Sequence, residues 1–121
     1  MKLYLQIIII LSTLIIIPCA AKSEAIETWE CVELNGATAT VIAQINEGGK
    51  TGQIQIADII YDTFVYSGTF FNRWDFGLNE SKNAYNNALV IKSDGKGLFF
   101  DFTQGYTVEP TQRFKCIMKK K

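Results

Sequence analysis

The 121-residue chain contains no histidine, and this absence removes several kinds of chemistry. Without an imidazole there is no Ser–His or Cys–His nucleophilic pair and no histidine ligand for a metal ion. An excess of charge of one sign is also missing, because twelve basic residues balance twelve acidic ones. A chain whose positive and negative charges balance has no broad positively charged surface for nucleic acid. The composition therefore predicts no nucleic-acid partner and no metal or other cofactor.

A long hydrophobic run occurs at the N-terminus, where residues 3–17 are almost entirely apolar. The run follows Lys2 and leads into small residues that end at Ala21, which is the layout of a secretory signal. A helix over this run would reach about 22 Å, which is short of a bilayer core of about 30 Å. We therefore expect residues 1–21 to be a cleaved signal peptide and residues 22–121 to form one exported domain, either periplasmic or secreted.

Cys19 offers a second interpretation of the same segment. With cleavage after Ala21, Cys19 occupies the −3 position of a signal-peptidase site. Alternatively, Ile16-Ile17-Pro18-Cys19 is a bacterial lipoprotein box, in which Cys19 is lipidated and anchors the chain in the cell envelope. In either case we expect membrane contact only through the signal segment or a lipidated Cys19.

Cysteine is scarce, and the two that remain after the signal segment lie near opposite ends of the domain, at Cys31 and Cys116. An even pair in an exported chain indicates a disulfide. Two thiolates alone do not fill a tetrahedral zinc site, and their spacing is not that of a Cys-x-x-Cys redox motif. We therefore predict a structural disulfide between Cys31 and Cys116 that closes a loop of about 85 residues.

Apolar residues alternate with polar ones along most of the domain, which is the period of a β-strand. Glycine-rich turns separate the alternating segments, as at 47–50 and 93–97, and longer loops are expected at 77–83 and 103–111. The predicted strands are 28–33, 37–45, 53–56, 59–66, 69–76, 85–92, 98–102 and 113–118. The sequence therefore predicts an all-β fold of seven or eight strands, an antiparallel meander closed as a small barrel, with a β-sandwich as the alternative. We expect the disulfide to join the first and last strands.

Aromatic residues concentrate between positions 61 and 76, where there are seven in sixteen residues. Alternation places Phe71, Arg73 and Asp75 together on one face of their strand, and exposed aromatic and arginine side chains are typical of binding hot spots. The predicted binding surface is Ser67, Phe71, Arg73, Trp74 and Asp75. The alternative is a structural barrel wall in which Arg73 and Asp75 form a local ion pair.

Carboxylates are the remaining route to catalysis, since a pair of them can hydrolyse a glycoside. The candidates are Asp58, Asp62, Asp75, Asp101 and Glu109, and their spacing marks no pair. Asp101 stands out because phenylalanines flank it, so we expect it on an outward face or buried against an arginine. We predict that the protein is not an enzyme. Whether Asn79, in the sequon Asn79-Glu80-Ser81, is glycosylated depends on the source of the chain.

Two short motifs resemble known families of exported β-proteins. Trp29-Glu30-Cys31 with Cys116 resembles the frame of the periplasmic inhibitors of c-type lysozyme, and Ser67-Gly68-Thr69-Phe70-Phe71 is similar to their Ser-Gly-x-x-Tyr inhibitory loop, with phenylalanine in place of tyrosine. Glu27-Thr28-Trp29 is similar to the Gly-x-Trp start of lipocalin-like carriers, with glutamate in place of glycine. The first resemblance implies an inhibitor, and the second a barrel that carries a ligand.

The sequence thus predicts a small exported binding domain. Its first expected role is a non-catalytic protein-binding or inhibitor module in the periplasm or outside the cell. The alternatives are a carrier of a small apolar ligand in a lipocalin-like barrel and an inhibitor similar to the c-type lysozyme inhibitors. The expected partner is accordingly another protein or a small apolar ligand.

Overall fold

Antiparallel β-strands account for the architecture of this chain. The computed structural model describes residues 24–35 and 40–120, and the predicted signal peptide 1–21, with Cys19, lies outside them. The strands are β1 (Ala25–Glu33), β2 (Thr40–Asn46), β3 (Thr51–Ile56), β4 (Ile59–Ser67), β5 (Phe71–Asn79), β6 (Ala84–Lys92), β7 (Lys96–Asp101) and β8 (Gln112–Lys120). Within the described ranges no helix is long and apolar enough to cross a membrane.

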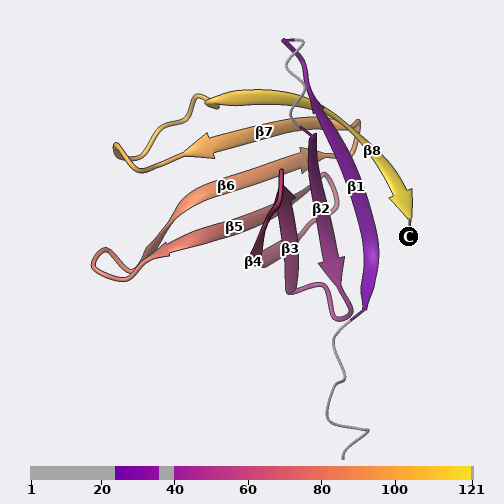
Figure 1. The fold of residues 1–121 in the computed structure, drawn as a ribbon, viewed down its shortest axis with the longest axis horizontal. Coiled ribbons are helices and arrows are strands. Elements are labelled where there is room, and N and C mark those ends of the chain that lie inside the picture. The colour runs from indigo at the N-terminus through magenta and orange to yellow at the C-terminus, as the bar shows by residue number, and fades with distance from the viewer. Residues whose placement is uncertain (1–23, 36–39, 121) are drawn as a thin grey trace, which may run out of the picture.

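The strands form a closed meander. Each strand pairs with the next one along the chain, and β8 returns to pair with β1, so the order around the barrel is β1 to β8 (Figure 1). All pairings are antiparallel. This confirms the predicted all-β barrel over the sandwich alternative. The main differences between the predicted and observed strands lie at their ends. For example, β5 starts at Phe71 and continues through Gly77 to Asn79, where the sequence predicts a loop.

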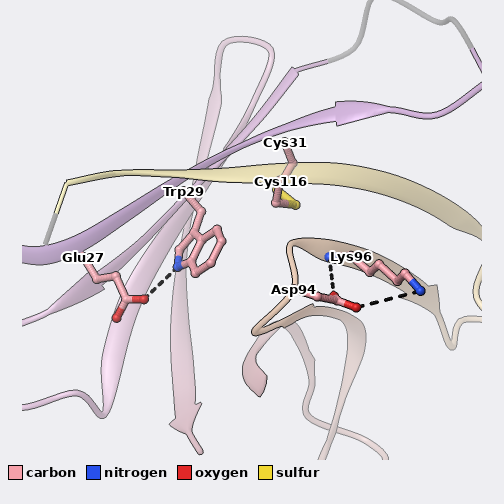
Figure 2. Close-up of a disulfide and its surroundings, with 6 residues drawn as sticks. All are labelled: Glu27, Trp29, Cys31, Asp94, Lys96 and Cys116. Atoms are coloured by element: carbon pink, nitrogen blue, oxygen red, sulfur yellow. Dashed lines mark hydrogen bonds and ion pairs between the residues drawn. A yellow bond between two sulfur atoms is a disulfide. The ribbon is translucent and has the colours of Figure 1, made fainter. Parts of the chain in front are cut away.

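The pairing of β1 with β8 carries the predicted disulfide. Cys31 lies directly opposite Cys116 in the register, and their sulfur atoms are 2.05 Å apart. Both cysteines point into the barrel and are buried. Two residues before Cys31, Trp29 is also buried, and its indole N–H donates to the Glu27 carboxylate at 2.8 Å (Figure 2). The disulfide is consistent with an exported protein.

The turn between β6 and β7 packs closely against the disulfide. Figure 2 shows Asp94 of this turn and Lys96, the first residue of β7, near the two cysteines. The backbone N–H of Cys116 donates to the carbonyl of Gly95 at 2.7 Å. A Cβ atom at Gly97 would lie 2.7 Å from the Cys116 sulfur, which is closer than two non-bonded atoms approach each other in proteins. Gly97 therefore makes room for the disulfide, which gives the Gly95-Lys96-Gly97 sequence a structural role.

Trp74 fills the centre of the barrel. Its side chain is 0% exposed, and its indole N–H donates to the backbone carbonyl of Gln44 on β2 at 3.0 Å. A Cβ atom at Gly52 on β3 would clash with that same carbonyl oxygen. The missing side chain at Gly52 therefore leaves space for a carbonyl that satisfies the buried indole. The rest of the core is apolar and includes Ile45, Ile54, Phe76, Leu89, Ile91 and Phe114.

Removal of the disulfide is expected to destabilise the barrel strongly. In the double variant Cys31→Ala/Cys116→Ala, the 85-residue loop regains its chain entropy in the unfolded state. We expect the free energy of unfolding to fall by about 4 kcal/mol. Urea denaturation of the oxidised protein and of the variant measures this difference. The reduced protein is the control and should unfold close to the variant, whereas a loss below about 1 kcal/mol would contradict the entropic role.

Candidate binding site

Three of the five predicted surface residues lie together on the outside of β5. Phe71, Arg73 and Asp75 alternate with inward-facing residues, and all three are partly or largely exposed. Trp74 corrects the prediction, because it is fully buried in the barrel and takes no part in a binding surface. Ser67 lies apart at the end of β4, where its hydroxyl donates to the carbonyl of Gly49 at 3.4 Å.

Arg73 and Asp75 form the local ion pair that the sequence suggested. The Arg73 Nε lies 2.9 Å from the Asp75 Oδ1, and the side chains remain 41% and 27% exposed. A pair this exposed contributes only about 0–1 kcal/mol to stability. Its stronger effect is positional, because Asp75 holds the guanidinium in one orientation while further N–H donors of Arg73 remain available for other partners.

Apolar side chains surround this ion pair on the neighbouring strands. Opposite Arg73 lie Tyr66 on β4 and Val90 on β6. Opposite Asp75 on β6 is the fully buried Ala88, which in turn faces Phe100 on β7.

The loop between β7 and β8 adds a stack of aromatic rings beside this surface. The Phe100 and Phe102 rings are 5.8 Å apart with 13° between their planes, and the Phe102 and Tyr106 rings are 5.7 Å apart at 5°. The backbone fixes the stack, since Phe102 N–H donates to the Asn86 carbonyl at 2.7 Å and Gly105 N–H donates to the Phe102 carbonyl. Tyr106 at its end is 84% exposed.

These parts enclose two adjoining hollows on the outer surface, which we call the outer groove. The first hollow, of about 460 Å³, reaches the β5–β6 turn and is lined by Asp75, Asn79, Lys82 and Asn86 among others. The second, of about 330 Å³, is lined by Phe71, Val90, Lys92, Phe100 and Val108 among others. Arg73, Phe102 and Tyr106 line both. In Figure 1 the β5–β6 turn and the β7–β8 loop lie at the same end of the barrel.

Asp101 stabilises the loop that carries the aromatic stack. Its carboxylate accepts a hydrogen bond from the Thr103 hydroxyl at 2.6 Å and another from the Thr103 backbone N–H at 2.9 Å. These two bonds, the hydroxyl first, lower the pKa of Asp101 below its usual value. Asp101 is exposed, so it is not buried against an arginine. Its backbone N–H donates to the Thr111 hydroxyl, which ties the start of the loop to its end.

Within the described residues, the barrel interior contains a small cavity. Its volume is about 120 Å³, and mostly apolar side chains line it, among them Ile54, Phe76 and Phe99. Sites for drug-sized ligands are usually about 300–1,000 Å³. Trp74 and its neighbours thus occupy the space that a carrier would offer to its ligand, and each hollow of the outer groove is larger than this cavity.

The described residues bring together no group of three or more side chains that would hold a metal ion. Two of the candidate carboxylates line different hollows: Asp62 on β4 lines a hollow with Thr51 and Phe64, whereas Asp75 on β5 lines the first hollow of the outer groove. No family model, curated protein or solved structure matches the chain, so its site is interpreted from its own geometry.

The predicted surface missed the residues that the loop and the β5–β6 turn supply. The sequence predicts Phe102 in a strand and Tyr106 in a loop, with no shared role, and its predicted surface includes neither Lys82 nor Lys92. A sequence signal was present, since Phe100, Phe102 and Tyr106 are closely spaced. Only the folding of the loop back over β6 brings these rings beside Arg73.

The substitution Thr103→Val is expected to raise the pKa of Asp101. It removes the hydroxyl that donates to the carboxylate and keeps the branched shape of the side chain. Because the folded-state pKa is lowered, Asp101 stabilises the loop above its unfolded-state pKa, and this contribution is lost as the pH falls through the folded-state value. An NMR titration of the carboxyl carbon measures the pKa.

The control is Thr107→Val, in the same loop, whose hydroxyl bonds to the Glu109 backbone and not to Asp101. It should leave the Asp101 pKa unchanged. An unaltered pKa in Thr103→Val would show that the hydroxyl does not hold the carboxylate.

Proposed function

We propose that this chain is a non-catalytic binding module that recognises its partner through the outer groove. The observation that carries the proposal is the exposed aromatic stack beside a guanidinium that Asp75 holds in place. Tyr106 and Val108 are 84% and 75% exposed, which costs hydrophobic stabilisation without a partner. Contiguous apolar surface rimmed by polar groups is characteristic of binding sites.

The site is proposed on the outside because the inside offers little room. The carrier alternative requires an apolar cavity large enough for a ligand, and the interior cavity is about 120 Å³. Trp74 is buried in the barrel with its indole N–H bonded to the Gln44 carbonyl, so its displacement by a ligand would leave that carbonyl without this partner. These facts favour recognition at the surface over carriage.

We further propose that the module acts in the periplasm or outside the cell. The layout of residues 1–21 and the Cys31–Cys116 disulfide support export. A lipidated Cys19 would instead anchor the same domain in the cell envelope.

Site-specific photo-crosslinking in cells that produce the full chain tests the proposed surface. A photoreactive phenylalanine analogue at Tyr106 should form a covalent adduct on illumination, because its ring lies in the groove. The same analogue at Ile117, which is exposed on β8 outside the groove, is the matched control. Mass spectrometry of the adduct identifies the class of partner. Adducts at Ile117 but not at Tyr106 would contradict the proposal.

The turn between β4 and β5 supports a second candidate, an inhibitor of c-type lysozyme. This turn contains the segment that resembles the inhibitory loop, in which Phe71, 39% exposed, occupies the position of the tyrosine. A bond from the Gly68 N–H to the Phe71 carbonyl at 2.9 Å closes the turn, so the ring projects from a fixed base.

A lysozyme assay with the purified chain tests this second candidate. Micromolar chain should slow cell-wall hydrolysis, and Phe71→Ala should abolish the effect because it removes the ring at the tyrosine position. Ile117→Ala is the control and should inhibit as the unaltered chain does. Unchanged lysozyme activity with the unaltered chain rejects the candidate.

A further inference from the structure

We propose that the outer groove binds an acidic oligosaccharide, a chain of sugar rings that carries carboxylate groups. This inference rests on the proposed function, because it names the ligand class for the same surface. It follows from three properties of the groove: flat aromatic surfaces, planar polar side chains at its floor and edge, and an excess of positive charge.

The aromatic surfaces suit the shape of a sugar ring. A pyranose has a flat face of C–H groups, which packs against the face of an aromatic ring. The Phe102 and Tyr106 rings lie almost parallel, at 5°, and Tyr106 is largely exposed. Such a platform offers apolar area with little conformational entropy to lose on binding.

The polar side chains suit the hydroxyl rim of the same ring. Asp75, Asn79 and Asn86 line the first hollow, and their planar carboxylate and amide groups accept or donate hydrogen bonds in fixed directions. Arg73 is shared by both hollows, and one of its five N–H donors is already used by Asp75. An apolar platform beside several fixed donors and acceptors matches a ligand with one apolar face and a polar edge.

The charge of the groove favours an acidic sugar over a neutral one. Its two hollows contain three cations, Arg73, Lys82 and Lys92, against the single carboxylate of Asp75. In the described part of the chain no carboxylate pairs with Lys82 or Lys92. Lys82 lines the first hollow and Lys92 the second, so the positive charge extends along the groove while the whole chain is neutral. Carboxylates on successive sugar rings would complement this arrangement.

The same observations disfavour two other macromolecular ligands. An extended peptide often binds by adding a strand to a free sheet edge, but the strand segments under the groove, 72–75 of β5 and 87–91 of β6, are already paired on both sides. Single-stranded nucleic acid also stacks on aromatic rings, but it requires a strongly basic channel, whereas Asp75 lies in the groove and the chain is neutral.

Binding is tested by NMR and calorimetry on the protein recovered from cells that express the full chain. The probes are hexamers of galacturonate, mannuronate and guluronate, and the hyaluronan hexasaccharide. The fully methyl-esterified galacturonate hexamer is the matched neutral probe. We expect saturable binding of at least one acidic probe, with shifted amides in β5–β7 and the 102–108 loop, and the neutral counterpart about tenfold weaker.

Three variants assign the contacts. Tyr106→Ala should weaken binding of the acidic probe about tenfold by removing the platform. Lys82→Ala/Lys92→Ala should weaken it and reduce its salt dependence, because two charge pairs with the probe, which salt would screen, are lost. Ile117→Ala, an exposed apolar residue outside the groove, should bind as the unaltered chain does. Urea midpoints for all variants separate lost contacts from lost folding.

Each result decides the proposal. No binding of any of the four acidic probes at millimolar concentration overturns it, as does tighter binding of a twelve-nucleotide single-stranded DNA. Equal binding of the neutral and acidic galacturonate hexamers overturns the acidic specificity. If the probes fail and a protein is crosslinked at Tyr106, only the ligand class is wrong. If the probes fail and nothing is crosslinked at Tyr106, the proposed function is wrong as well.

Discussion

The pairing of β1 with β8 is the constraint on which the rest of this structure depends. It closes the meander into a barrel, and the Cys31–Cys116 disulfide makes that closure covalent. A closed barrel of eight strands has an interior only wide enough to be filled by side chains or to hold one small ligand. Here Trp74 is fully buried in the interior, so closure and a large central side chain together leave little internal space.

The filled interior has a specific physical basis. Trp74 brings a polar N–H into an apolar core, and the carbonyl of Gln44 satisfies it at 3.0 Å. That carbonyl is accessible because Gly52 on the neighbouring strand has no side chain. A ligand that displaced Trp74 would break this bond. Under the outer groove, residues 72–75 of β5 and 87–91 of β6 are paired on both sides, which disfavours peptide binding there by strand addition.

Much of the fold could be predicted from the sequence, because a half-buried strand imposes an alternation of period two. That alternation identified the strand regions, and the positions of Cys31 and Cys116 predicted the disulfide. The outward row of Phe71, Arg73 and Asp75 follows from the same pattern. The predicted surface includes Trp74 because of its sequence neighbours. Alternation, however, puts Trp74 and Arg73 on different faces of the strand, and Trp74 therefore faces inward.

The other half of the site could not be predicted, because it depends on contacts between distant segments. Phe102 and Tyr106 belong to a loop whose path is set by the Asp101–Thr103 bonds and by the backbone bond to Asn86. Lys82 and Lys92 come from opposite ends of the β5–β6 hairpin, in its turn and at the end of β6. Periodicity describes single strands and carries no information on which loop folds over which face.

The most direct test of the central claim is a hydrogen–deuterium exchange footprint of the chain with and without its bound partner. If recognition occurs on the outer groove, slowed exchange should appear in residues 71–75, 86–92 and 100–108, with little change in β2 and β3. Slowed exchange confined to β2, β3 and the residues around the interior cavity would contradict the account, because it would place the ligand inside the barrel.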